Sequence, residues 1–186
     1  MSPIYLILAL SVLAQASFAG ELPNKVSGPS LASSGTAEVK AGAKGLVVAF
    51  LSARCPCSNS HTGELKSLAK EFPGFSFVGV HANGDEPLDL SQKYFKEAAL
   101  EFPVIRDGEQ KLLQEFRALK TPHAFVVSPA GALLYKGGVS SSSDFARADH
   151  KYLREALEDL DQGRVVRTPS SRTLGCVIAR GGRDAE

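Results

Sequence analysis

An apolar run at residues 46–51 leads directly into a cysteine–proline–cysteine turn at residues 55–57. A short run without polar alternation is typical of a strand that is buried on both faces of a sheet. After the turn, apolar residues recur at helical spacing as far as Phe72, and Pro73 and Gly74 then stop the helix. The sequence therefore predicts a core strand, a cysteine turn and a helix in direct succession, which is the beginning of an α/β fold.

Strands and helices continue to alternate along the rest of the chain. Two further core strands are predicted over 75–80 and 102–105, a hairpin over 124–127 and 132–135, and helices over 88–100, 110–119 and 144–160. This order predicts a central, mostly parallel sheet with an antiparallel edge hairpin and with helices on both faces.

The N-terminus has the pattern of a signal peptide over residues 1–19. Residues 4–14 form an apolar core that is too short to span a bilayer, and Ser17 and Ala19 supply small residues before a cut at Gly20. We therefore expect an exported protein, periplasmic or secreted, that does not span a membrane after cleavage.

Composition divides the remaining chain into three parts. Residues 20–40 are rich in Ser, Gly and Pro and predict a flexible lead-in, residues 41–163 hold the predicted domain, and residues 164–186 form a C-terminal tail that carries Cys176. The formal net charge is +1 with acids and bases interspersed, so no basic field points to nucleic acid as a partner.

Cys55 lies where a strand gives way to a helix N-terminus. Backbone N–H groups and the positive end of the helix dipole converge there and favour a thiolate over a thiol. Arg54 would add positive charge, and Pro56 fits the first helical position, where a missing N–H costs nothing. Cys55 is thus the predicted nucleophile, with Cys57 beside it. The alternative is that both are inert buried thiols.

These motifs together resemble the thioredoxin-like superfamily. The resemblance rests on the strand–Cys-Pro-x-Ser–helix succession, on Thr121-Pro122 before a hairpin strand, and on a Pro-x-Gly hairpin turn. It is closest to the redoxin group, which includes peroxiredoxins and exported thioredoxin-like reductases. The resemblance implies that Thr121-Pro122 is a cis-proline loop against the reactive cysteine. It also implies that Ser52 takes the place of the hydroxyl residue three positions before a peroxidatic cysteine.

The sequence also departs from the thioredoxin pattern. The second thiol comes one position early, at Cys57, and Ala49 stands where thioredoxins carry a buried acid. The Gly175-Cys176 pair resembles a subset of exported redoxins with a cysteine in the tail, which implies a third redox thiol. A Cys55–Cys57 disulfide would be strained, whereas Cys176 could pair with either cysteine with less strain, so the connectivity stays open.

Three functions follow as hypotheses. The first is a thiol–disulfide oxidoreductase in which Cys55 attacks a protein disulfide and Cys57 or Cys176 resolves the mixed disulfide, with an upstream thiol as electron donor. The second is a thiol peroxidase, in which Cys55 reduces peroxides through a sulfenic acid. The third is a copper-binding module or metallochaperone. Its metal ligands would be Cys55, Cys57, His61 and His123. The first two hypotheses require no metal and no cofactor.

Overall fold

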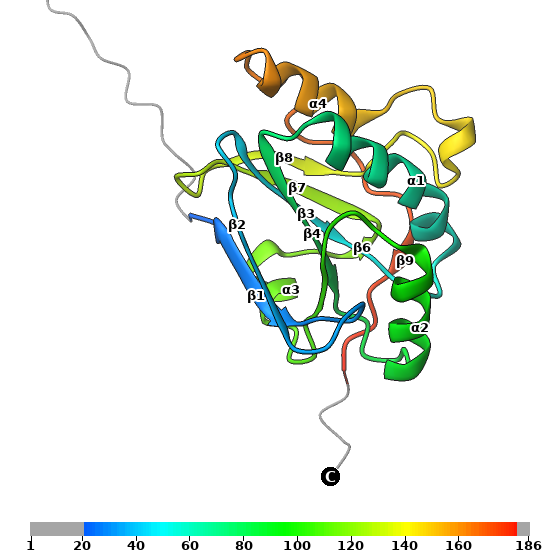
Figure 1. The fold of residues 1–186 in the computed structure, drawn as a ribbon. Coiled ribbons are helices and arrows are strands. Elements are labelled where there is room, and N and C mark those ends of the chain that lie inside the picture. The colour runs from blue at the N-terminus through cyan, green and yellow to red at the C-terminus, as the bar shows by residue number, and fades with distance from the viewer. Residues whose placement is uncertain (1–20, 182–186) are drawn as a thin grey trace, which may run out of the picture.

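The computed structural model describes residues 21–181, so the predicted signal peptide lies outside the described residues. Within them, the central sheet has five strands in the spatial order β5-β4-β3-β7-β8 (Figure 1). The bounds of these strands are β3 Gly45–Phe50, β4 Phe75–His81, β5 Val104–Arg106, β7 His123–Val127 and β8 Leu133–Gly137. Each predicted core strand is therefore present, with bounds that shift by one or two residues.

The sheet is evenly mixed rather than mostly parallel. Strand β3 pairs parallel with β4, and β4 pairs parallel with β5, whereas β3–β7 and β7–β8 are antiparallel. After β5 the chain returns across the sheet. Strand β7 then pairs with the remaining edge of β3 and runs in the opposite direction to it. The closing hairpin therefore contributes two antiparallel pairings instead of one edge pairing.

Helices cover both faces of this sheet, as predicted. Alternate residues of β3 point to opposite sides, so Val47 and Ala49 join one apolar cluster while Val48 and Phe50 join the other. The first cluster packs under three helices, and the second packs under one helix and an N-terminal hairpin. The helices are α1 Pro56–Glu71, α2 Leu88–Ala98 and α4 Tyr152–Asp161 on the first face, and α3 Lys111–Phe116 on the second.

Residues 25–40 are not the flexible lead-in that their composition suggests. They form the antiparallel hairpin of β1 Lys25–Pro29 and β2 Thr36–Lys40. Val26 is 1% exposed and packs in the second apolar cluster, where the half-buried Val39 lies against it. The hairpin is ordered because its alternating apolar residues cover this face of the sheet, a pattern that the surrounding Ser, Gly and Pro residues obscure.

The predicted helix over residues 144–160 is divided in two. A short 3₁₀ turn spans Phe145–Arg147, and α4 begins only at Tyr152. The Asp144 side chain accepts a hydrogen bond from the Ala146 N–H and caps the start of the 3₁₀ turn. Beyond the turn, the N–H groups of Asp149 and His150 donate to the Ser141 hydroxyl instead of to helix carbonyls, which interrupts what the apolar pattern presents as one helix.

Residues 164–181, called the C-terminal strap below, run back along the domain instead of fraying (Figure 1). At its start, the buried Asp159 carboxylate binds the guanidinium groups of Arg164 and Arg167. Further on, strand β9 Cys176–Val177 pairs antiparallel with β6 Lys120–Thr121. Ile178 is buried in the second apolar cluster, which docks this part of the strap against the domain.

The described residues contain no helix that is both long enough and apolar enough to cross a membrane.

Candidate active site

Cys55 is the N-cap residue of α1, as the sequence predicts. Its backbone is extended, and its sulfur accepts a hydrogen bond from the Ser58 N–H at 3.4 Å. Pro56 occupies the first helical turn, where no backbone donor is lost. Cys55 is 1% exposed, so its sulfur lies beneath the surface at the positive end of α1.

The structure brings all three cysteine sulfurs together. The sulfurs of Cys55, Cys57 and Cys176 lie within 4.8 Å of one another. Cys57 comes from the first turn of α1 and Cys176 from β9 of the strap, and both are partly exposed. The three thiols are unpaired in this structure, so it shows a reduced site.

The Thr121-Pro122 loop closes the other side of Cys55. The peptide bond before Pro122 is cis, as the resemblance implies. The Cys55 thiol donates to the Thr121 carbonyl at 3.1 Å. The same loop carries β6, so one segment contacts the nucleophile through Thr121 and also holds β9.

The three thiols differ in acidity. Burial raises the pKa of Cys55, but the Cys176 side chain and the hydrogen bond from the Ser58 N–H lower it, and the pKa lies below its ordinary value. Burial and the neighbouring Cys55 charge raise the pKa of Cys57. Burial and the hydrogen bond to Cys55 raise the pKa of Cys176 to about 12. The site therefore favours one thiolate flanked by two protonated thiols.

A buried polar network, which sequence reasoning missed, holds the loop before Cys55. The Glu86 carboxylate accepts from the Ser52 hydroxyl, from the Ala53 N–H at 2.9 Å and from Asn83 at 2.8 Å. It also contacts the His81 ring at 3.1 Å. Burial raises the pKa of Glu86, but the bonds to His81, Ser52 and Ala53 lower it to about 2.

Ser52 connects this network to the nucleophile. Its hydroxyl oxygen accepts from the Cys55 N–H at 3.0 Å and from the Arg54 N–H at 3.2 Å, while its proton goes to Glu86. Glu86 thus fixes the turn through Ser52. The available signal was an acid directly before a proline and a helix, close behind the core strand that ends in His81. Distance in sequence concealed its contact with the cysteine turn.

Arg54 lies beside the cysteine turn with its side chain exposed. The first causes that lower the pKa of Cys55 include the Cys176 thiol and the Ser58 N–H. The predicted aid from its charge is therefore not among the main causes of the lowered pKa.

The histidines of the predicted metal set lie apart from the sulfurs. His61 is buried, with Nδ1 against the Cys57 carbonyl at 2.6 Å and Nε2 against the Ser140 hydroxyl at 2.8 Å. His123 stands on β7 with its ring against Phe125 at a centroid distance of 4.3 Å. Neither belongs to the group of close sulfurs. Three thiolates at this spacing suit a thiophilic ion such as Cu(I), so Cys176 replaces the histidines in any such ligand set.

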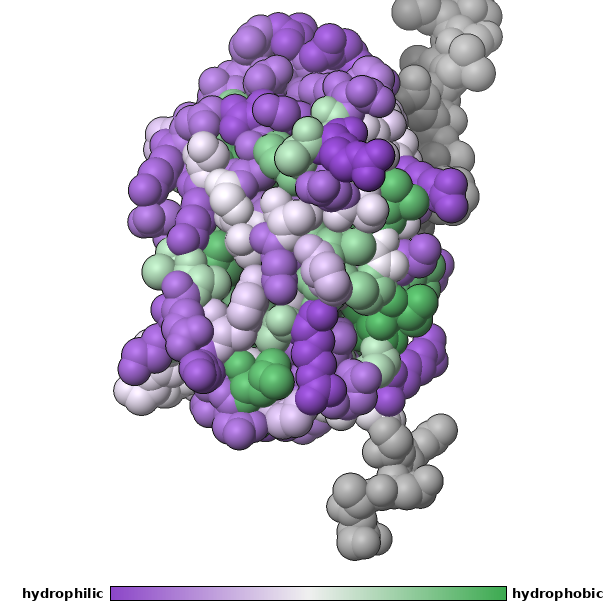
Figure 2. All heavy atoms as spheres, turned by 90° about the vertical axis from the view of Figure 1, so that its right-hand side faces the viewer, coloured by the Kyte–Doolittle hydropathy of each residue, from purple (hydrophilic) through white to green (hydrophobic). Residues whose placement is uncertain are grey.

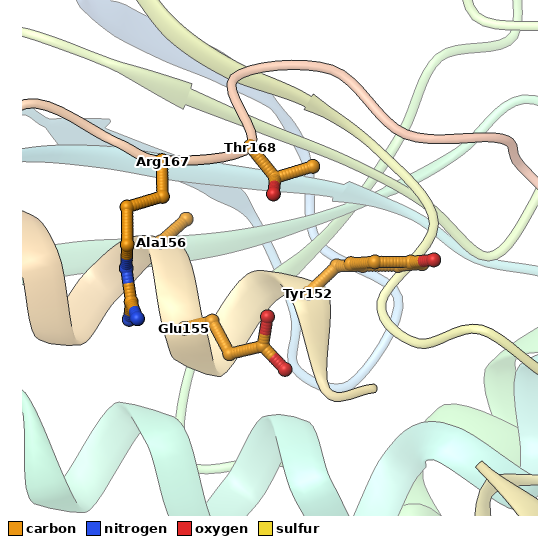
Figure 3. A pocket seen from close by; sticks show the side chains of 5 residues that line it. All are labelled: Tyr152, Glu155, Ala156, Arg167 and Thr168. Carbon is orange, nitrogen blue, oxygen red and sulfur yellow. The ribbon is translucent and has the colours of Figure 1, made fainter. Parts of the chain in front are cut away.

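Two surface hollows lie away from the three cysteines. The smaller, of about 160 Å³, is lined by Tyr152, Glu155 and Ala156 of α4 and by Arg167 and Thr168 of the strap (Figure 3). The larger, of about 530 Å³, lies between α3 and the end of the strap at Arg180 and Gly181. No cysteine lines either of these two hollows.

A mixed α/β sheet, an N-capping cysteine and a cis-proline loop define a thioredoxin-like thiol redox enzyme. Residues 28–136, more than half of the chain, match the AhpC/TSA family model. The chain therefore belongs to the AhpC/TSA family of redoxins. A comparison with curated proteins gives no match.

Solved structures share the fold at low sequence identity. An uncharacterized conserved protein from Geobacillus kaustophilus superposes with a TM-score of 0.77 at 22% identity, over 90% of this chain and 93% of that one. The peroxidoxin BcpB from Mycobacterium tuberculosis gives 0.57 at 18% identity, over 78% and 97%. StoA from Bacillus subtilis gives 0.53 at 16% identity, over 63% and 89%. These likenesses confirm the thioredoxin-like fold.

Proposed function

We propose that this protein is an exported thiol–disulfide oxidoreductase, with Cys55 as nucleophile and Cys176 as resolving thiol. The observation that carries the proposal is the cluster of three sulfurs within 4.8 Å, in which the pKa of Cys55 alone is lowered. A low pKa at a helix N-terminus is the usual property of an attacking thiol.

The reaction proceeds in two exchanges. The Cys55 thiolate attacks one sulfur of the substrate disulfide, which forms a mixed disulfide and releases the other sulfur as a thiolate that takes up a proton. Cys176 then loses its proton and attacks the Cys55 sulfur, which releases the second substrate thiol and leaves a Cys55–Cys176 disulfide. The substrate gains two electrons and two protons, and an upstream dithiol donor must restore the protein.

Cys176 is preferred over Cys57 as the resolving thiol because of chain geometry. Cys55 and Cys57 are separated by one residue that lies in the first helical turn, and a disulfide across so small a ring is strained. Cys176 approaches from a different segment, and its hydrogen bond is the largest contribution that lowers the pKa of Cys55. Cys57 remains next to the pair as the alternative partner.

Replacement of Cys55 tests this proposal. We expect the reduced protein to be oxidised by oxidised glutathione with loss of two thiols, and Cys55→Ser to lose this reaction by at least about 100-fold because no activated thiol remains. Cys57→Ser is the matched control and should keep most of the rate. Undiminished oxidation of Cys55→Ser would exclude Cys55 as the nucleophile.

Peroxide is the second candidate substrate, because the family is AhpC/TSA and because Ser52 lies beside Cys55 at a hydrogen-bond distance of 3.0 Å. The Ser52 proton is given to Glu86, however, so the hydroxyl is not free to donate to a bound peroxide. Stopped-flow oxidation by hydrogen peroxide decides the matter, since a rate no faster than that of free cysteine removes this candidate.

Export rests on the predicted signal peptide. If the leader is functional, protein recovered from outside the cytoplasm begins at Gly20, which N-terminal sequencing can establish.

A further inference from the structure

The backbone edge nearest the nucleophile is occupied by the chain's own strap. Strand β6 pairs with β9 in the register Thr121–Cys176 and Lys120–Val177. Thr121 is also the residue whose carbonyl lies 3.1 Å from the Cys55 sulfur. Cys176 therefore occupies the place beside Cys55 where a cysteine of an incoming extended chain would lie.

An extended polypeptide needs such an edge, because its backbone groups must find partners once they leave water. A cysteine within a long polypeptide brings several residues of backbone on each side, and these must lie against the surface around Cys55 when its sulfur reacts. Within the part of the chain that the structure describes, β6 has β9 as its strand neighbour. A polypeptide that pairs with Thr121 must therefore first remove β9.

The strap is fixed on both sides of Cys176. Before it, the Ser171 hydroxyl lies 2.7 Å from the Tyr135 hydroxyl and accepts from the Gly138 N–H at 3.1 Å. After it, the Ala179 carbonyl accepts from the Gln110 side chain at 2.8 Å and from the Gly84 N–H at 3.0 Å. Displacement of β9 thus breaks several hydrogen bonds in addition to its own pairing.

Two glycines allow this close fit of backbone on backbone. Gly175 has φ +152, and a Cβ there would lie 2.0 Å from the Thr121 carbonyl oxygen. A Cβ at Gly84 would lie 2.5 Å from the Cα of Gly181. Because the obstructing atoms are main-chain atoms, a methyl group at either position must push the strap outwards.

A small disulfide meets a lesser barrier. The Cys55 sulfur lies within 4.8 Å of the sulfurs of Cys57 and Cys176, and both of these residues are partly exposed. Rotation of the Cys176 side chain about χ1 moves its sulfur without breaking the β6–β9 pairing, so a small disulfide can approach Cys55 while the strap stays in place. Figure 2 shows the side of the molecule that bears α1, α2 and β9, where pale and green surface is interspersed with purple, hydrophilic residues.

We propose that the strap sets substrate specificity, so that the native enzyme reduces low-molecular-weight disulfides and excludes disulfides held in extended polypeptides. This inference rests on the proposed function and names its substrate class. A small disulfide RSSR reacts with the Cys55 thiolate to give Cys55–S–S–R and one RS⁻, which is protonated. Cys176 then releases the second RSH and forms the Cys55–Cys176 disulfide. Two protein thiols are oxidised for each disulfide reduced.

The test compares two oxidants on the reduced full chain and on strap variants. Single-turnover loss of protein thiols is measured with oxidised glutathione and with insulin, and the ratio of the two rate constants is the readout. Gly175→Ala and Gly84→Ala displace the strap from opposite sides of Cys176. Gly181→Ala lies within the strap, with nothing within 4 Å of its added Cβ, and is the matched control.

We expect the wild type and Gly181→Ala to favour oxidised glutathione. In both strap-displacing variants the insulin rate should rise about tenfold or more, because the lost hydrogen bonds no longer hold β9 in place. Displacement of Cys176 also raises the pKa of Cys55, but this lowers both rates alike, so the ratio of the two rate constants reports access to Cys55. Circular dichroism establishes folding, and Gly84→Ala decides alone if Gly175→Ala does not fold.

Two results distinguish a failure of this inference from a failure of the proposed function. If the wild type reduces insulin as fast as it reduces oxidised glutathione, or if neither folded variant changes the ratio, the strap does not select the substrate and this inference is wrong. If neither oxidant reacts faster with the wild type than with free cysteine, the proposed function itself fails.

Discussion

The pKa of Cys55 is set by groups that lie next to its sulfur. Its burial alone would favour the thiol, and the compensating contacts come from the Cys176 side chain and the Ser58 N–H. Burial and the contact with Cys55 in turn raise the pKa of Cys176. The pKa of Cys55 and the pKa of Cys176, its proposed resolving partner, therefore depend on each other.

The pH profile of alkylation measures this tuning. We expect the Cys55 alkylation rate to rise with a midpoint below the value of about 8.5 for an unperturbed cysteine. Cys176→Ala should move the midpoint upwards, because it removes the largest lowering contribution to the pKa of Cys55. Cys57→Ala is the control and should move it less. A midpoint in Cys176→Ala equal to that of the wild type would show that the strap thiol does not stabilise the thiolate.

Glu86 acts at the same scale through Ser52. Its folded pKa of about 2 lies below its ordinary value, so the unfolded chain binds its proton at a higher pH than the folded chain does. The stability contributed by Glu86 is therefore complete above about pH 5 and is lost as the pH falls towards 2.

Glu86→Gln should lower the free energy of unfolding at pH 7 by about 2–3 kcal/mol. It should also flatten the dependence of stability on pH between about 5 and 2. Urea denaturation across this range measures both effects. Asp85→Asn, in the same loop, is the control and should retain the wild-type pH dependence. Equal slopes in the wild type and Glu86→Gln would show that Glu86 titrates normally.

Among the elements, the C-terminal strap differs most from its sequence-based description. Composition describes residues 164–186 only as a tail that carries Cys176, but the strap is bound at its start, middle and end. Asp159 holds its first residues, since its carboxylate accepts from Arg164 at 2.7 Å and from the Arg167 side chain at 2.9 Å. These bonds lower the pKa of Asp159, which keeps the clamp charged at neutral pH.

Loss of the ion pairs between Asp159 and the two arginines should loosen the first residues of the C-terminal strap. In Asp159→Asn we expect the amide hydrogens of Lys136 and Ser171, which pair strap and β8, to exchange about tenfold faster. Hydrogen exchange with mass or NMR detection resolves them. Asp161→Asn is the matched control on the same helix, since its carboxylate pairs with the exposed Lys44. Unchanged exchange rates of these amide hydrogens in Asp159→Asn would mean that the Asp159 ion pairs do not hold the strap.

For the whole molecule, sequence patterns predicted the elements that are defined locally. The apolar run before Cys55, the helix after it and the Pro-x-Gly hairpin are all present because each carries its own periodicity or turn residues. The cis bond before Pro122 followed from resemblance, since a Thr-Pro pair does not by itself specify the isomer.

Contacts between distant segments could not be predicted in the same way. Glu86 meets Ser52 across a strand and a helix, and Cys176 meets Thr121 only because the strap is routed along the domain. No local pattern encodes either meeting. The sequence predicts Cys55 as the nucleophile with Cys57 or Cys176 as the resolving thiol, and in the structure the three sulfurs lie within 4.8 Å of one another.

Disulfide mapping tests the central claim most directly. The reduced full chain is treated with one equivalent of oxidised glutathione, quenched with an alkylating agent, digested and analysed by mass spectrometry. We predict one intramolecular disulfide, between Cys55 and Cys176, with Cys57 alkylated. A product in which Cys176 is alkylated and Cys55 is joined to Cys57, or in which Cys55 stays reduced, would contradict this account.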